Sequence, residues 1–167
     1  MPHDLRARRF TPDIQATVQN FSCGDEDWSI KMSEWISGTP CIMSMNRGTE
    51  VWLFSNDAGT IVGFGSVGVT DWPWPEPGCP KEKICIIPAM AVHKAFQGNG
   101  YSRRIIRFLV GRAITYRLFG LALYVNPQNE AAIELYRSEN FAMLPDTYKG
   151  NCKMVLILEG IEPANPV

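Results

Sequence analysis

The sequence has few of the residues that build metal centres or covalent cross-links. It holds two histidines, His3 and His93, and five cysteines that are scattered along the chain without a C-x-x-C pair. We therefore expect no bound metal and no disulfide framework. No apolar run approaches the roughly 20 residues of a membrane span, and the N-terminal arginines are not followed by the apolar region of a signal peptide. These absences predict a cytoplasmic protein that does not enter a membrane.

Acidic residues are missing from one long stretch of the chain. The net charge is −1, which gives no general attraction to nucleic acid, yet Lys83 to Asn129 contains no Asp or Glu. The positive charges of this stretch are Lys83, Lys94, Arg103, Arg104, Arg107, Arg112 and Arg117. Such a local excess suits a polyanionic ligand, and a solvated basic helix face is the alternative interpretation.

Length and composition indicate a single globular domain over residues 1–167. The chain is 46% hydrophobic and 20% charged, it has no internal repeat, and no segment has the composition of a linker between domains. Hydrophobic periodicity predicts strands at 5–8, 50–55, 61–69, 83–92, 121–125, 141–144 and 154–158. It predicts helices at 11–20, 25–36, 101–118 and 128–138. This order predicts an α/β (α+β) fold, with a mixed, largely antiparallel central sheet flanked by helices.

The segment Gln97–Ser102 has the properties of a phosphate-binding loop. It lies between the predicted strand that ends at Val92 and the predicted helix that begins at Tyr101. The first N–H groups of a helix have no partner within the helix, and the helix dipole is positive there. Gly98 and Gly100 let the backbone approach a ligand closely. The segment lacks the third glycine of a dinucleotide fingerprint and the G-K-[ST] ending of a P-loop. A plain glycine turn is the alternative.

Two blocks of the sequence resemble the GNAT superfamily of acyl-CoA-dependent N-acetyltransferases. Gln97–Ser102 is similar to the family's Q/R-x-x-G-x-G/A motif, with Ser102 in the place of the last small residue. Val125–Phe141 is similar to V-x-x-x-N-x-x-A-x-x-L-Y-x-x-x-G-F, with Asn140 at the glycine position, which Asn tolerates because it can adopt left-handed backbone. The resemblance covers a cofactor-binding core of about 83–144, and it implies the GNAT (acyl-CoA N-acyltransferase) fold and acetyl-CoA as the cofactor.

The resemblance also implies roles for individual residues. The backbone of Met90, Ala91 and Val92 would pair with the pantetheine arm, and Asn129 would donate a hydrogen bond to that arm. Tyr136 would be the catalytic acid that protonates the departing thiolate, with core packing as its alternative role. The residues expected around the pyrophosphate are Gln97, Gly98, Asn99, Gly100, Tyr101, Ser102 and Arg103, reinforced by Arg104 and Arg107.

The general base is not evident from the sequence. Many family members carry a glutamate on the strand before the loop, whereas residues 84–90 contain none. Water, Glu50, Glu76 or Glu82 could take the proton instead. An acetyl-accepting role for Cys85 and a proton relay at His93 are less favoured than structural roles for both residues.

The acceptor is the least determined part of the prediction. Three candidate substrate-binding residues lie in or beside a proline-rich segment: Trp72, Trp74 and Glu82. The two tryptophans could instead cover the core or a subunit interface. A homodimer is possible on this ground. We expect a primary amine on a small molecule or peptide. Phe21–Trp28 resembles the F-x-C-G start of toxin-type GNAT enzymes of toxin–antitoxin pairs, which acetylate aminoacyl-tRNA. A pI near 6.1 argues against a tRNA substrate. A non-catalytic CoA-binding module is the remaining alternative.

Overall fold

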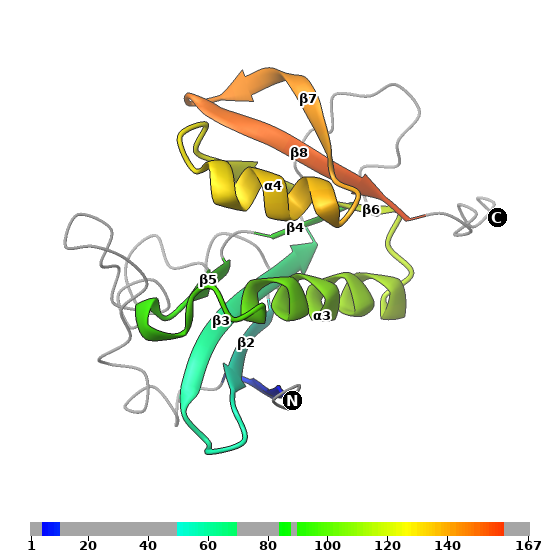
Figure 1. The fold of residues 1–167 in the computed structure, drawn as a ribbon. Helices are drawn as coiled ribbons and strands as arrows, with labels where there is room; N and C mark the ends of the chain where they lie inside the picture. Colours follow the sequence, from blue (N-terminus) through cyan, green and yellow to red (C-terminus); the bar gives the residue numbers. More distant parts are fainter. Residues whose placement is uncertain (1–4, 11–49, 70–83, 88–89, 159–167) are drawn as a thin grey trace, which may run out of the picture.

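The computed structural model describes residues 5–10, 50–69, 84–87 and 90–158 (Figure 1). Within these ranges one sheet has the strand order β1-β2-β3-β4-β6-β8-β7, and β5 pairs with β3 beside this path. Its strands are β1 (Arg6–Arg9), β2 (Glu50–Ser55), β3 (Ile61–Val69), β4 (Ile84–Ile86), β5 (Met90–Val92), β6 (Gly120–Val125), β7 (Ala142–Tyr148) and β8 (Asn151–Ile157). The described helical elements are the short 3₁₀ turn η4 (Lys94–Phe96), α3 (Tyr101–Thr115) and α4 (Glu130–Ser138).

The sheet is the mixed, largely antiparallel sheet that the sequence predicts. Neighbouring strands pair antiparallel, except that β4 and β6 run parallel. The helices α3 and α4 lie on the same side of the sheet, α3 in front of β2 and β3 and α4 in front of β6 and β8 (Figure 1). Buried side chains of both helices form one hydrophobic cluster with the strands. The space between the two helices therefore lies over the middle of the sheet, where β4 and β5 are found.

The predicted single strand over 83–92 is wrong in one respect, because the structure divides it into β4 and β5. Ile87 still donates its N–H to the Ala122 carbonyl of β6 at 2.9 Å. The next residue in the sequence, Pro88, has no N–H with which to continue that ladder. Met90–Val92 then pairs with β3 alone among the described strands. The chain thus keeps β3 as its partner on one side and loses β6 on the other, in the middle of what the sequence shows as a continuous apolar run.

Other boundaries differ for identifiable local reasons. The helix α3 ends at Thr115 rather than at residue 118, since Arg117 takes a positive φ of 53°. The last two strands are longer than predicted and form a hairpin, whose turn residues Lys149 and Gly150 both have positive φ. A register shift between Met143 and Thr147 accommodates Pro145 within β7.

Two predicted turn positions are confirmed. Gly59 has φ 77° in the turn between β2 and β3, and its N–H donates to the Asn56 carbonyl at 2.9 Å. Asn140 has φ 66°, which is the left-handed conformation expected from its place in the second motif.

The helix α3 packs closely on β3 because two positions of that strand lack a side chain. A Cβ at Gly63 would lie 2.7 Å from the Ala91 carbonyl oxygen and from Ile105 Cδ1, and one at Gly65 would lie 2.9 Å from Leu109 Cδ1. Ile105 and Leu109 are fully buried on this face of α3. The close approach fixes the first turn of α3 beside β5.

We predict that Gly63→Ala destabilises the fold. Its new methyl group meets a backbone oxygen that cannot move without shifting β5, so we expect the free energy of unfolding to fall by about 1–3 kcal/mol. Gly65→Ala should cost less, since it meets side-chain methyl groups of Ile105 and Leu109 and no backbone atom. The control is Gly111→Ala, where a Cβ meets nothing within 4 Å, and we expect a gain of about 0.5–1 kcal/mol. Urea unfolding measures all three, and equal effects at Gly63 and Gly111 would contradict the packing argument.

Candidate functional site

The strand β5 has one edge that no other described strand occupies. His93 donates its N–H to the Val62 carbonyl at 2.8 Å, so its backbone groups face β3. Backbone groups alternate along a strand, so those of Ala91 face β3 as well, and those of Met90 and Val92 point to the opposite edge. An extended ligand could pair with this edge as an added strand. The backbone groups of Met90 and Val92 therefore face the edge that no other described strand occupies, whereas those of Ala91 face β3.

The loop after β5 is held in shape by its own side chains. Gln97 donates from Nε2 to the Val92 carbonyl at 3.1 Å, which ties the loop to the end of β5. Asn99 donates from Nδ2 to the carbonyls of Phe96 and Gln97 at 3.2 and 3.1 Å. His93 Nδ1 accepts from the Ala95 N–H at 3.1 Å and begins η4. This local role accounts for His93 without a proton relay.

The two glycines of the loop are needed for backbone conformation rather than for space. Gly98 and Gly100 have φ of 78° and 76°, where a side chain is strained. A Cβ at either position would meet nothing within 4 Å. The loop therefore presents an open surface beside the start of α3.

The first turn of α3 is suited to an anion. Its N-cap is Gly100, which offers no capping side chain, and the turn contains no acidic residue. The N–H groups of a helix start that lack side-chain caps can donate to a ligand oxygen, and the dipole adds partial positive charge. Tyr101 contributes only its backbone here, since its ring is buried and packs edge-on against Phe96 at 6.2 Å between centroids. Ser102 follows on the same turn and is half-buried.

Two of the arginines expected at the anion site are already paired. Arg107 donates from Nε and Nη2 to the two carboxylate oxygens of Glu139, at 2.8 and 3.1 Å. Arg103 donates from Nη2 to Ser138 Oγ at 3.1 Å and has its Nε 3.5 Å from Glu139 Oε1. These contacts join the first two turns of α3 to the end of α4. The sequence did not reveal Glu139 or Ser138 as partners of these arginines. The available signal was the spacing of Arg103 and Arg107, since two like charges four residues apart on a helix repel each other and favour a nearby acidic residue.

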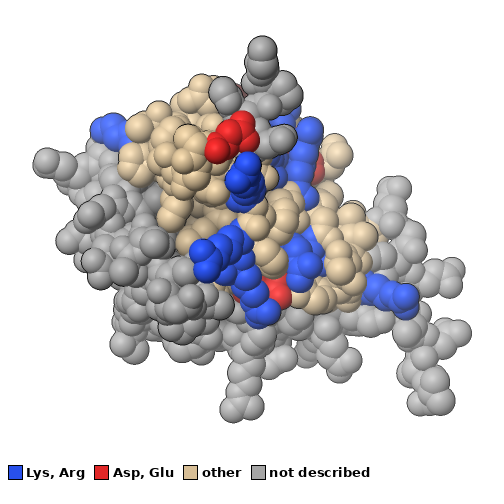
Figure 2. Space-filling model, turned by 90° about the horizontal axis from the view of Figure 1, so that it is seen from below, with Lys and Arg blue, Asp and Glu red and all other residues tan. Residues whose placement is uncertain are grey.

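Among the charged side chains visible on one face of the molecule, basic ones exceed acidic ones (Figure 2). Figure 2 shows Lys and Arg gathered on the face seen from below, with few acidic side chains among them. The helix α3 alone carries four arginines and no acid. The local excess predicted from the acid-free stretch is therefore present in space, but part of it is neutralised by carboxylates from outside that stretch.

Asn129 begins α4 and keeps one polar group for other contacts. Its Oδ1 accepts from the Ala132 N–H at 3.2 Å, which caps the helix. The cap explains why α4 starts at Glu130 and not at 128. Its Nδ2 has no partner among the described residues and is able to donate a hydrogen bond.

Tyr136 lies near the other end of α4 as a buried, neutral phenol. The residue is 8% exposed, and its ring packs against Phe141 with centroids 5.7 Å apart. Burial raises the pKa of Tyr136 to about 12. A phenol with this pKa keeps its proton at neutral pH, so it can act as a proton donor and not as a base. Both roles raised by the sequence, core packing and acid, are compatible with this placement.

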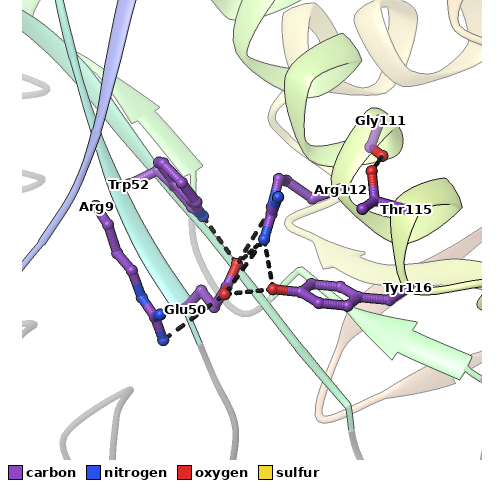
Figure 3. Close-up of polar contacts among 7 residues, drawn as sticks. All are labelled: Arg9, Glu50, Trp52, Gly111, Arg112, Thr115 and Tyr116. Carbon is purple, nitrogen blue, oxygen red and sulfur yellow. Dashed lines mark hydrogen bonds and ion pairs between the residues drawn. The ribbon is translucent and has the colours of Figure 1, made fainter.

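Glu50 belongs to a separate polar cluster between β2 and the end of α3 (Figure 3). Arg112 donates to its carboxylate at 3.2–3.4 Å, Trp52 Nε1 donates at 3.1 Å, and the Tyr116 hydroxyl donates as well. Arg9 approaches to 3.7 Å from β1. Burial raises the pKa of Glu50, but these donors outweigh burial and leave it below its usual value. Such a carboxylate is a weak base, which disfavours Glu50 as the general base.

Several sequence candidates cannot be placed. Trp72, Trp74, Glu76 and Glu82 lie outside the described residues, as does Phe21–Trp28. Within the described ranges, no three His, Cys, Asp or Glu side chains come together to hold a metal ion. Neither described α-helix is long and apolar enough to cross a membrane.

Comparison with known protein families gives one match that spans most of the chain. The model of the family described as Acetyltransferase (GNAT) family matches residues 16–141. A curated relative, the uncharacterized N-acetyltransferase YdgE of Bacillus subtilis, is 30% identical over 92 residues. That region is 55% of this chain and 54% of the relative, so the match spans about half the length of each.

Solved structures share the fold at low sequence identity. The ribosomal-protein-S18-alanine N-acetyltransferase from Escherichia coli has a TM-score of 0.70 at 15% identity, with 98% of this chain and 99% of that chain covered. The protein yncA from Salmonella typhimurium, determined with its cofactor acetyl-CoA, has a TM-score of 0.63 at 19% identity over 98% of both chains. A mutant of the spermidine N-acetyltransferase SpeG from Vibrio cholerae has a TM-score of 0.64 at 12% identity, with 92% and 93% covered. The common feature is the fold.

We predict that Glu50→Gln lowers stability and removes part of its acid sensitivity. Because the folded-state pKa of Glu50 is lowered, its contribution is present above the unfolded-state pKa and is lost as pH falls through the folded-state pKa. We expect a loss of about 2 kcal/mol at pH 7, less than for a fully buried pair since Arg9 is exposed. The difference from wild type should shrink in acid, as measured by urea unfolding between neutral pH and about pH 3. Glu134→Gln, at an exposed position of α4, is the matched control. A pH-independent difference would refute the assignment.

Proposed function

The chain belongs to the acetyltransferase (GNAT) family, and from this premise we propose that it moves the acetyl group of acetyl-CoA directly to a primary amine of a small molecule or peptide. The family is one of acyltransferases that use acetyl-CoA as donor. One observation carries the proposal: an edge of β5 that no other described strand pairs with leads into a glycine loop and a helix start that lacks a side-chain cap. We propose that a single domain over residues 1–167 carries the activity.

The described residues fit the donor at three points. The first turn of α3, after Gly98 and Gly100, offers N–H groups to a pyrophosphate. The outward groups of Met90 and Val92 suit the amide groups of a pantetheine arm, and the free Nδ2 of Asn129 can donate to the same arm. Acetyl-CoA supplies a thioester, whose carbonyl carbon an amine can attack.

Val92 and Tyr136 would carry the two charge movements of the reaction. The Val92 N–H, which points to the open edge, would donate to a carbonyl oxygen as that oxygen gains negative charge. Tyr136, a buried phenol that is protonated at neutral pH, would give its proton to the departing thiolate.

The amine must lose a proton to become a nucleophile. Glu50 is held by Arg112, Trp52 and Tyr116 and is not available for this task. Glu76 and Glu82 remain the glutamate candidates, with water as the alternative acceptor. We propose no single group among them.

The charge pattern favours a small or peptidic amine over tRNA. Arg103, Arg107 and Arg112 are paired with Glu139 or Glu50, so less basic surface is left for a polynucleotide than the sequence suggests. Two of the solved structures that share the fold are a spermidine acetyltransferase and an acetyltransferase of a ribosomal-protein alanine. Both kinds of amine, on a polyamine or on a peptide, fall within the proposed class. Cytoplasmic location and a homodimer stay predictions.

We predict that Tyr136→Phe lowers kcat by about 10- to 100-fold and leaves the KM for acetyl-CoA unchanged. The variant keeps the ring packing against Phe141 and removes only the hydroxyl group that would give the proton. Thiol release from acetyl-CoA, followed with a panel of primary amines, measures the effect. Tyr124→Phe is the matched control, since burial raises the pKa of Tyr124 to about 12 as well, and its ring packs on Tyr148 instead.

Two outcomes would contradict the proposal. Unchanged turnover in Tyr136→Phe would remove Tyr136 from the mechanism. CoA binding by wild type without thiol release for any amine would favour a non-catalytic CoA-binding module. Growth arrest on expression, together with acetylated aminoacyl-tRNA, would favour the toxin-type alternative.

A further inference from the structure

Glu139 is an acidic residue in an unfavourable place for a helix. It is the C-cap of α4, where the helix dipole is negative and a basic residue would be stabilised. Its side chain is only 11% exposed. A buried carboxylate at this position needs compensation, and the described contacts supply it through Arg103 and Arg107 of the other helix.

The contacts orient both guanidinium groups. Arg107 meets the carboxylate through Nε and Nη2, the two-point geometry that fixes the plane of a guanidinium. Arg103 uses Nε and Nη2 as well, toward Glu139 and Ser138. The Ser138 hydroxyl is itself held, because it donates to the Leu135 carbonyl at 2.7 Å. Each arginine thus has one edge fixed on the end of α4.

The other edge of each guanidinium remains able to bind an anion. An arginine has five N–H donors, and the described contacts of Arg103 and Arg107 use Nε and Nη2 only. The side chains are 50% and 63% exposed, so these donors reach the surface. Two cations share one carboxylate, which leaves a local charge of +1. The pair is positioned by α4 and keeps half of its positive charge.

The position along α3 indicates which anion the pair would meet. Arg103 and Arg107 follow the first helical residue, Tyr101, by two and six positions, or about 3 and 9 Å along the axis. The pyrophosphate is already served by backbone N–H groups at the helix start. CoA carries one further anionic group, a phosphate monoester on the 3′ position of its ribose. A doubly charged monoester is the chemistry that two fixed guanidinium groups recognise.

We propose that Glu139 is a positioning residue that holds Arg103 and Arg107 as a subsite for the 3′-phosphate of CoA. This inference rests on the proposed function, because it assumes that the pyrophosphate binds at the start of α3. The subsite makes the protein prefer CoA over 3′-dephospho-CoA. Its effect lies in donor binding and leaves the acetyl-transfer step unchanged.

Calorimetric titration of the full chain with CoA and with 3′-dephospho-CoA tests the inference without an acceptor. We expect wild type to bind CoA about 10- to 30-fold more tightly than the dephospho form. Glu139→Gln should reduce this preference to about two- to threefold, and its affinity for dephospho-CoA should stay within about twofold of wild type. A variant that simply failed to fold would lose affinity for both ligands. The Arg103→Gln/Arg107→Gln variant should lose the preference as well, and adding Glu139→Gln to it should change nothing more. Glu134→Gln, on the exposed side of α4, should keep the wild-type preference.

The outcomes separate this inference from the proposed function. A wild-type preference below about twofold would overturn the subsite, and tighter CoA binding in Glu139→Gln would show that the carboxylate competes with the phosphate. If Glu139→Gln fails to fold, the arginine variant decides the question alone. Binding of both ligands with no preference overturns the subsite only, whereas binding of neither overturns the proposed function too.

Discussion

The backbone pairing of one short segment determines where the site lies. Ile84–Ile87 satisfies its polar groups with β3 and β6, and Met90–Val92 satisfies them with β3 alone among the described strands. A buried strand edge without a partner is costly, so such an edge persists where something else pairs with it. After Ile87 the chain keeps β3 as its partner and leaves an edge that no other described strand pairs with, where an extended ligand could add. The loop and α3 follow directly after this edge, which places anion-binding groups at its end.

Close packing and charge then hold the surrounding helices. Gly63 and Gly65 let α3 approach β3, so the helix start cannot drift from β5. The first two turns of α3 are also joined to the end of α4, because Arg103 and Arg107 pair with Glu139. A third tie, the Glu50 cluster, fixes the end of α3 on β2. The three contacts fix α3 along its length, and a loop at its start is therefore held in a constant position relative to the sheet.

The sequence predicted what is local and missed what depends on tertiary contacts. The order of the described elements, the turn at Gly59, the left-handed Asn140 and the loop before α3 follow from patterns within a few residues. The break between β4 and β5 could not be read from a continuous apolar run, because it depends on which strand lies on each side. Glu139 and Glu50 stand outside the acid-free stretch, so their pairing with its arginines requires the folded arrangement. Periodicity placed Tyr136 on a helix, and only the structure shows that it is buried.

The pairing of the positive charges between Lys83 and Asn129 indicates which kind of ligand the protein can bind. A run of arginines in a sequence suggests a broad positive field, which would suit a long polyanion. In the fold, carboxylates from two distant segments take up part of that charge, and Arg112 is directed to a cluster near the far end of α3. What remains lies beside the first turns of the helix, where backbone N–H groups also point outward. A compact ligand with a few phosphates fits such a distribution, and a polynucleotide that needs many contacts along its length does not. The positive charge at the start of α3 and the edge of β5 that no other described strand pairs with thus suit the same ligand. That ligand is one extended molecule with its phosphates at one end.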